Sequence, residues 1–248
     1  MSIPSSLTHL YSTRALPHLG ESLARNQTII EKIVEDIAIS VPLGRRLLVA
    51  GSGHSGLFAL ELYHRAGGVN FVVPIVADYL LPSAGPTVVR ALERMPQSLV
   101  PIFYRFQPQR GDMMWIASQS GINAASVELA LEAQKGGVQV VAFTRLTHSQ
   151  AVDSRHASKK RLYEVSDVVV DLGGFVGDAA VSVSPEVTAG PLSTLTSVFL
   201  GHSILVATAA RLEQAGHRCV YTSVNTPTGE DRNRALEAVS RETDFLLR

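Results

Sequence analysis

The chain has 248 residues, 46% hydrophobic and 18% charged, which fits one large α/β domain or two small ones and excludes a disordered chain. Lys and Arg together number 22, and so do Asp and Glu, so the formal net charge is zero. We therefore expect neither nucleic acid nor a membrane as a partner. Cys219 is the only cysteine, which excludes an intrachain disulfide. Because no signal peptide and no apolar stretch of about 18 residues is apparent, we expect a soluble cytoplasmic protein.

The first expected element is a long helix at about residues 15–40, where apolar residues recur every three or four positions until Pro42 and Gly44. Short apolar runs then alternate with helical patterns. The expected strands are Arg46–Ala50, Phe71–Val76, Met113–Ala117, Val138–Phe143 and Asp167–Asp171. The expected helices are Ser55–Ala66, Val88–Arg94, Asn123–Lys135 and Ser193–Ala215.

This order of elements predicts a doubly wound α/β sheet with helices on both faces. Three stretches are expected to be irregular, namely Leu80–Pro86, Thr144–Lys160 and Gly173–Pro191. Ligands of such sheets bind at the carboxyl ends of the strands. We therefore expect functional residues in these stretches and in the strand-exit turns.

Two strand-exit turns share one plan, an apolar strand followed by small residues and a helix start. The first turn runs from Gly51 to Gly56 (GSGHSG) and the second from Ser118 to Asn123 (SQSGIN). Free N–H groups and the helix macrodipole favour an anion at such places, and serine hydroxyls add hydrogen-bond donors. Neither turn contains Lys or Arg, so a phosphate would be held by dipoles and hydrogen bonds. The alternative is that these residues only cap two helices.

The first turn also matches the dinucleotide-binding pattern G-x-G-x-x-G. The acidic residue Asp78 follows the next expected strand, although farther along than the usual acidic partner. The second serine turn has no role in that interpretation. Neither turn has the G-x-S-x-G pattern of a nucleophile elbow and the chain has no P-loop, which disfavours a serine hydrolase or a P-loop protein.

The second turn resembles the phosphate loop of the sugar isomerase (SIS) domain family, and the first resembles that family's first strand-to-helix turn. The resemblance covers about residues 20–215 and is greatest to an uncharacterised phosphoheptose-isomerase-like branch. Further motifs shared with that branch are Arg65-Ala66-Gly67-Gly68, Ser154-Arg155-His156, Lys160-Arg161-Leu162-Tyr163-Glu164 and Gly177-Asp178-Ala179.

The resemblance implies a single SIS domain over residues 1–248, with the N-terminal helix and a C-terminal extension at about 220–248. It implies a five-stranded parallel sheet in a flavodoxin-like three-layer sandwich, a sugar phosphate as the small-molecule partner, and a homodimer or homotetramer with a shared active site. The residues expected to bind the substrate or its phosphate are Ser52, Ser55, Ser118, Gln119, Ser120, Asn123 and Asp178. For Asp178 the alternative is that it only organises a turn.

Phosphoheptose isomerases of this family carry a metal-binding His and Glu on the helix after the first turn. The corresponding residues here are Glu61 and Arg65. The resemblance therefore implies that this zinc site is missing, and we expect no metal and no cofactor.

Isomerisation of a sugar phosphate moves a proton between neighbouring carbons, which needs a base and an acid. Glu61 is the expected base, because burial among apolar neighbours would raise the pKa of its carboxyl. His54 and His156 are the expected groups for ring opening or carbonyl polarisation. The simpler alternatives are an exposed helix glutamate, a solvent-facing turn histidine and a surface-loop histidine.

Together these features predict a sugar-phosphate isomerase of the aldose–ketose type. Two alternatives stay open. The protein could be a sugar-phosphate sensor without catalysis, or an NAD(P)-binding dehydrogenase.

Overall fold

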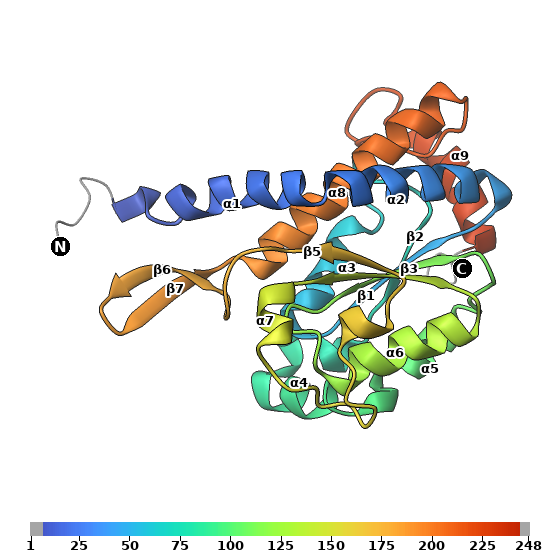
Figure 1. The fold of residues 1–248 in the computed structure, drawn as a ribbon. Helices are drawn as coiled ribbons and strands as arrows, with labels where there is room; N and C mark the ends of the chain where they lie inside the picture. Colours follow the sequence, from blue (N-terminus) through green and yellow to red (C-terminus); the bar gives the residue numbers. More distant parts are fainter. Residues whose placement is uncertain (1–6, 244–248) are drawn as a thin grey trace.

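The computed structural model describes residues 7–243 and is built on a five-stranded parallel sheet (Figure 1). Its order is β2-β1-β3-β4-β5. The strands are β1 (Leu47–Gly51), β2 (Val72–Ile75), β3 (Met113–Ala117), β4 (Gln139–Thr144) and β5 (Val168–Asp171). Each lies within one residue of the range expected from the sequence. The expectation of a doubly wound α/β sheet is confirmed.

Helices cover both faces of the sheet, which explains why the strands are almost wholly apolar. In β1, Leu47 and Val49 face a core shared with α2 (Gln27–Ser40), α3 (Gly56–Leu62) and α8 (Ser193–Gln214). Leu48 and Ala50 face the opposite core. The helices on that side are α4 (Pro86–Leu92), α5 (Val100–Arg105) and α6 (Ala124–Lys135).

The single helix expected at about 15–40 is two helices, α1 (Ser12–Arg25) and α2, with Asn26 between them. The Asn26 side chain donates to the carbonyls of Ser22 and Asp171 and accepts from the Asp171 N–H. These bonds fasten the junction to the end of β5. α1 extends beyond the edge of the sheet (Figure 1).

The stretch Gly173–Pro191, expected to be irregular, contains a β-hairpin, which corrects that expectation. Its strands are β6 (Ala179–Ser184) and β7 (Val187–Pro191), and it lies beside α1 outside the main sheet (Figure 1). Because residues 182–189 are exposed, the hairpin lacks the continuous apolar run that marks the buried strands.

Three further α-helices of the described chain were also not expected: α5, α7 (Leu146–Gln150) and α9 (Gly229–Thr243). α9 lies within the expected extension at about 220–248, of which residues 244–248, like residues 1–6, lie outside the described part. Short 3-10 helices join the elements at Leu7–His9, Val41–Leu43, Gly53–Ser55, Asp78–Leu80, Pro82–Ala84, Pro96–Ser98 and Leu162–Val165.

One helix, α8, has the length and apolar composition of a membrane span, contrary to the expectation that no stretch would. Half of its most apolar window is buried inside the protein. Gly201 lies so close to α3 that a Cβ there would be 2.7 Å from the ring of Phe58. The apolar character of α8 is therefore explained by its packing over the sheet.

Candidate functional site

The sheet order creates a crevice between β1 and β3. β1 leads into α3 on one face of the sheet, whereas β3 leads into α6 on the other. The two strands are hydrogen-bonded neighbours, with Gly51 opposite Ala117, so Ser52 and Ser118 leave the sheet side by side. In sheets of this order, ligands bind where neighbouring connections diverge in this way.

A hollow of about 320 Å³ lies at this place and is called the serine hollow below. The seven residues that the sequence analysis expected to bind substrate all line it: Ser52, Ser55, Ser118, Gln119, Ser120, Asn123 and Asp178. Four further residues complete the lining: Glu93, His148, Gly177 and Ser193. No Lys or Arg side chain of residues 7–243 belongs to it.

The first turn is shaped by close backbone contact. A Cβ on Gly51 would overlap the carbonyl oxygen of Ser55, so only glycine fits there. Within residues 7–243, the N–H groups of Ser52 and Gly53 donate to no acceptor. Unpaired donors at the edge of a hollow are suited to an anionic ligand.

The second turn presents the same kind of groups. Gly121 has a φ of +61°, and its N–H donates to the Ser118 hydroxyl at 3.3 Å. The N–H groups of Gln119 and Ser120 find no acceptor in the described chain. Asn123 stands before α6, and its Oδ1 accepts from Arg155 at 2.7 Å. The two turns therefore bring hydroxyls and free amides to one hollow.

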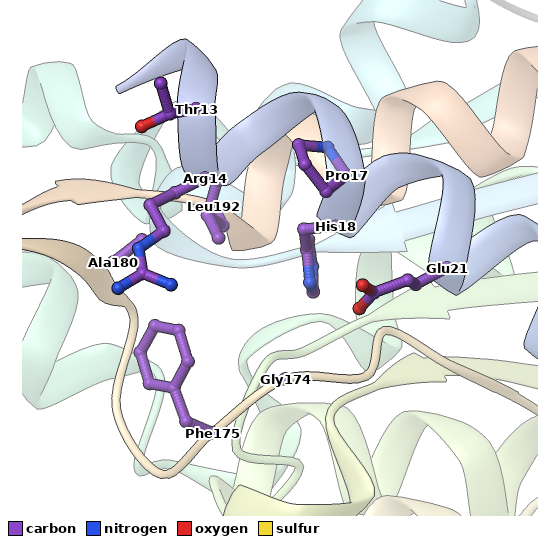
Figure 2. A pocket seen from close by; sticks show the side chains of 9 residues that line it. All are labelled: Thr13, Arg14, Pro17, His18, Glu21, Gly174, Phe175, Ala180 and Leu192. Carbon is purple, nitrogen blue, oxygen red and sulfur yellow. The ribbon is translucent and has the colours of Figure 1, made fainter. Parts of the chain in front are cut away.

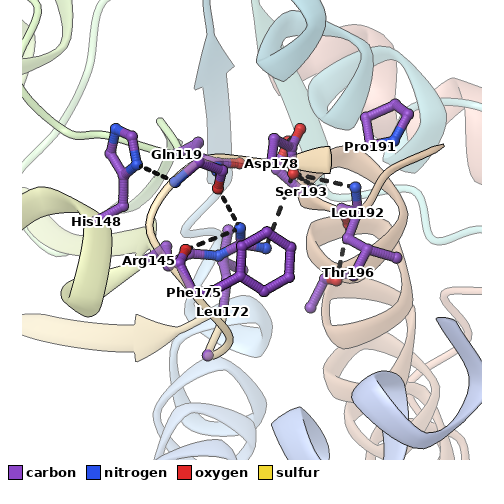
Figure 3. Close-up of polar contacts among 12 residues, drawn as sticks. Gln119, Arg145, His148, Leu172, Phe175, Asp178, Pro191, Leu192, Ser193 and Thr196 are labelled. Carbon is purple, nitrogen blue, oxygen red and sulfur yellow. Dashed lines mark hydrogen bonds and ion pairs between the residues drawn. The ribbon is translucent and has the colours of Figure 1, made fainter. Parts of the chain in front are cut away.

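Asp178 closes the hollow from the root of the hairpin and also caps α8. Its Oδ1 accepts from the N–H groups of Leu192 at 3.0 Å and Ser193 at 2.8 Å, and its Oδ2 accepts from the Ser193 hydroxyl at 2.7 Å (Figure 3). These contacts correspond to the turn-organising alternative. They also hold the carboxylate at the wall of the hollow.

Glu93 is a half-buried carboxyl that no sequence motif indicated. Burial raises the pKa of Glu93, while hydrogen bonds from the side chains of Asn123 and Ser52 and the charge of Arg155 oppose that rise. A carboxylate with a raised pKa is a stronger base than an ordinary carboxylate, which suits proton transfer. Glu93 lies just after α4, and its carbonyl accepts from the Ala125 N–H at 3.1 Å, which ties it to the second turn.

His148 is a second titratable group in the serine hollow. Its Nδ1 accepts from the Gly177 N–H at 2.7 Å (Figure 3), so the neutral ring carries its proton on Nε2. Burial lowers the pKa of His148, and the charge of Arg145 lowers it further. The ring is therefore a neutral donor through Nε2. Its position in Thr144–Lys160, at the carboxyl end of β4, was the only signal in the sequence.

Comparison with known proteins places this chain in a family. The model of the SIS domain matches residues 11–145, more than half of the chain. The chain belongs to the SIS-domain family. The matched segment of this SIS-domain protein contains both serine turns and Glu93, whereas His148, Asp178 and Ser193 lie beyond it.

The relatives of this SIS-domain protein include proteins named only as UPF0309, and it belongs to that family too. It is 34% identical over 222 residues to a UPF0309 protein of Shouchella clausii, covering 88% of this chain and 90% of the relative. It is 31% identical over 233 residues to one of Brucella ovis, covering 94% and 95%. A phosphoheptose isomerase from Francisella tularensis has the same fold, with a TM-score of 0.54, 14% identity, and coverage of 86% of this chain and 100% of that one.

The three residues expected to be catalytic in this SIS-domain protein do not line the serine hollow. Glu61 pairs with Arg65 and lies 3.5 Å from Nε2 of His202 on α8. His54 is exposed, and its carbonyl accepts from the Thr194 hydroxyl. The lining from the first turn ends at Ser55, before α3 begins, so the side chain of Glu61 near the end of that helix lies outside the hollow.

His156 is buried rather than placed on the loop surface. Its Nε2 lies 2.7 Å from a carboxylate oxygen of Glu128 on α6, and its Nδ1 lies 2.8 Å from the Ser158 hydroxyl. These contacts fasten the loop after α7 to the body of the SIS domain.

Two alternatives for a cofactor or metal can be compared with these positions. Asp78, the acidic partner in the dinucleotide interpretation, is exposed and does not line the serine hollow. Within residues 7–243, no group of three or more His, Cys, Asp or Glu side chains is arranged to hold a metal ion.

Proposed function

We propose that the serine hollow binds the phosphate of a sugar phosphate and that the protein isomerises the sugar by aldose–ketose proton transfer. The observation that carries the proposal is the convergence of serine hydroxyls and unpaired N–H groups from two neighbouring turns. These donors suit a phosphate without any cation in the lining. Ser52, Ser55, Ser118, Gln119, Ser120 and Asn123 would contribute the contacts.

Glu93 is the proposed base in this reaction. Its carboxylate would take the proton from the carbon beside the sugar carbonyl and return it to the former carbonyl carbon. The proton that the substrate hydroxyl loses would pass to the other oxygen, so that the product is an isomer with no group gained or lost. The raised pKa of Glu93 makes its carboxylate a stronger base than an ordinary glutamate.

His148 is the proposed donor to the sugar carbonyl. Its Nε2–H would stabilise negative charge that develops on that oxygen, as a neutral imidazole does without giving up a full proton. Asp178 would hold the wall of the hollow next to a sugar hydroxyl. Glu61, His54 and His156 stay predictions as catalytic groups, and their positions outside the hollow favour Glu93 and His148 instead.

The test is turnover and binding of a panel of hexose, heptose and amino-sugar phosphates, with products identified by NMR. We expect Glu93→Gln to lower kcat by about a hundredfold or more while the dissociation constant of the substrate stays nearly unchanged. Glu61→Gln is the matched control and should leave kcat unchanged. Loss of turnover in Glu61→Gln alone would return the role of base to Glu61.

The same panel separates the other functions. Binding without product by the unaltered protein would identify a sensor, and a rise in Tm with NAD or NADP but not with sugar phosphates would identify the dehydrogenase. A single domain over residues 1–248, a cytoplasmic location and a homodimer or homotetramer with a shared site stay predictions. Gel filtration with light scattering tests the last of these.

A further inference from the structure

A second cavity, of about 470 Å³, lies between α1 and the loop before the hairpin (Figure 2). It shares no lining residue with the serine hollow. The side chains of Arg14, His18 and Glu21 project into it from α1, opposite Gly174 and Phe175 (Figure 2). Its volume is in the range of small-molecule sites.

His18 is the residue of this cavity that indicates a bound ligand. The residue is only 8% exposed, and its Nε2 has no hydrogen-bond partner among residues 7–243. The ring packs against the loop, since a Cβ on Gly174 would be 3.2 Å from the His18 Cε1. Burial lowers the pKa of His18, with a further contribution from the charge of Arg145. The neutral ring is a buried polar group that lacks a partner in the protein.

Three head groups that differ in hydrogen bonding lie along one face of α1. Arg14, His18 and Glu21 are spaced by four and three positions, which puts them on the same side of the helix. The guanidinium of Arg14 only donates hydrogen bonds, and the carboxylate of Glu21 only accepts them. The unpaired Nε2 of a neutral His18 donates or accepts, depending on the tautomer. A ligand must therefore offer acceptors and donors close together.

The charges at the cavity select against a ligand with a net charge. Arg14 and Glu21 are of opposite sign, so an anion attracted by one is repelled by the other. Hydroxyl groups donate and accept at once and carry no charge, so a row of them matches all three side chains. Phe175 and Leu192 add apolar surface for carbon-bound hydrogens.

We propose that this cavity is a second binding site, for an uncharged polyhydroxylated ligand such as a free sugar ring. The proposal does not depend on what the serine hollow binds. Arg14 would donate to hydroxyl oxygens, Glu21 would accept from hydroxyl groups, and His18 would gain the partner that it lacks.

The test is saturation-transfer NMR on the full chain with glucose, mannose, N-acetylglucosamine and myo-inositol. We expect at least one of them to bind with a Kd of millimolar order, and Arg14→Ala and Glu21→Gln each to weaken that binding about tenfold. Both residues are exposed, so these variants should fold, whereas a change at the buried His18 would disturb the packing of α1.

Arg211→Ala and Glu35→Gln are matched controls, since both side chains are exposed and lie outside the cavity. These two variants, and Ser120→Ala in the serine hollow, should bind the sugar with the same Kd as the unaltered protein. Absence of binding at about 20 mM of every sugar would overturn the proposal, as would sensitivity to Ser120→Ala or indifference to Arg14→Ala and Glu21→Gln. Tighter binding of malonate or putrescine than of any sugar would overturn the assignment to an uncharged ligand.

Discussion

The Nη2 atom of Arg145 lies 3.8 Å from Oδ1 of Asp178, and this pair joins the end of β4 to the root of the hairpin (Figure 3). Arg145 is fully buried. Its Nη1 donates to the carbonyls of Phe175, at 3.3 Å, and Gly177. Gln119 of the second turn donates to the same Gly177 carbonyl at 2.6 Å. One guanidinium therefore fixes the loop that walls the serine hollow.

We expect Arg145→Met to lower the free energy of unfolding by about 3 kcal/mol. The substitution leaves the Asp178 carboxylate without its cation and the Phe175 carbonyl without its donor, and it removes one of the two donors to the Gly177 carbonyl. Urea denaturation measures the change. Lys32→Met, which removes the exposed pair between Lys32 and Asp36, should cost less than about 1 kcal/mol. Equal losses in the two variants would contradict a structural role for Arg145.

The difference in stability between Glu93→Gln and the unaltered protein should depend on pH. Because the folded protein raises the pKa of Glu93, the folded state holds that proton more tightly, and the contribution to stability falls as pH rises above the ordinary value of 4.5. Glu93→Gln cannot ionise. Its Tm relative to the unaltered protein should therefore be higher at about pH 7 than at about pH 4. A difference in Tm that stays constant with pH would show that Glu93 ionises as freely as in the unfolded chain.

His148 should be neutral and protonated on Nε2. The Gly177 N–H occupies its Nδ1, and the pKa lies below the ordinary 6.5. Because the folded state disfavours the charged ring, its contribution to stability is complete above pH 6.5 and decreases as pH falls below it. The ¹⁵N shifts of the imidazole identify the tautomer, with His148→Gln used for assignment. A proton on Nδ1 at neutral pH would disprove the proposed donor geometry.

Two glycine substitutions should have opposite effects. Gly51→Ala should lower the free energy of unfolding by about 2 kcal/mol or more, because the new methyl group overlaps the Ser55 carbonyl oxygen. Gly20 lies inside α1, and a Cβ there meets nothing within 4 Å. Gly20→Ala should therefore raise the free energy of unfolding by about 0.5–1 kcal/mol. Thermal or urea denaturation of both variants checks the pair, and a neutral Gly51→Ala would mean that the first turn relaxes.

The sequence determined the central sheet because each buried parallel strand is a short continuous apolar run with its own turn signal. It also determined the serine turns, since small residues directly after a strand mark a place where the backbone can approach a ligand. β1 and β3 are adjacent, so the two turns meet without any further contact being needed.

Only the tertiary structure decided which titratable groups reach the serine hollow. Glu93 follows a helix and has no local motif, and it arrives there because its carbonyl binds the start of α6. Glu61 had the more suggestive sequence position, yet its carboxylate turns to Arg65 and His202. Which face of a helix points at a ligand depends on long-range packing against other helices, and a local pattern of residue types does not contain that information.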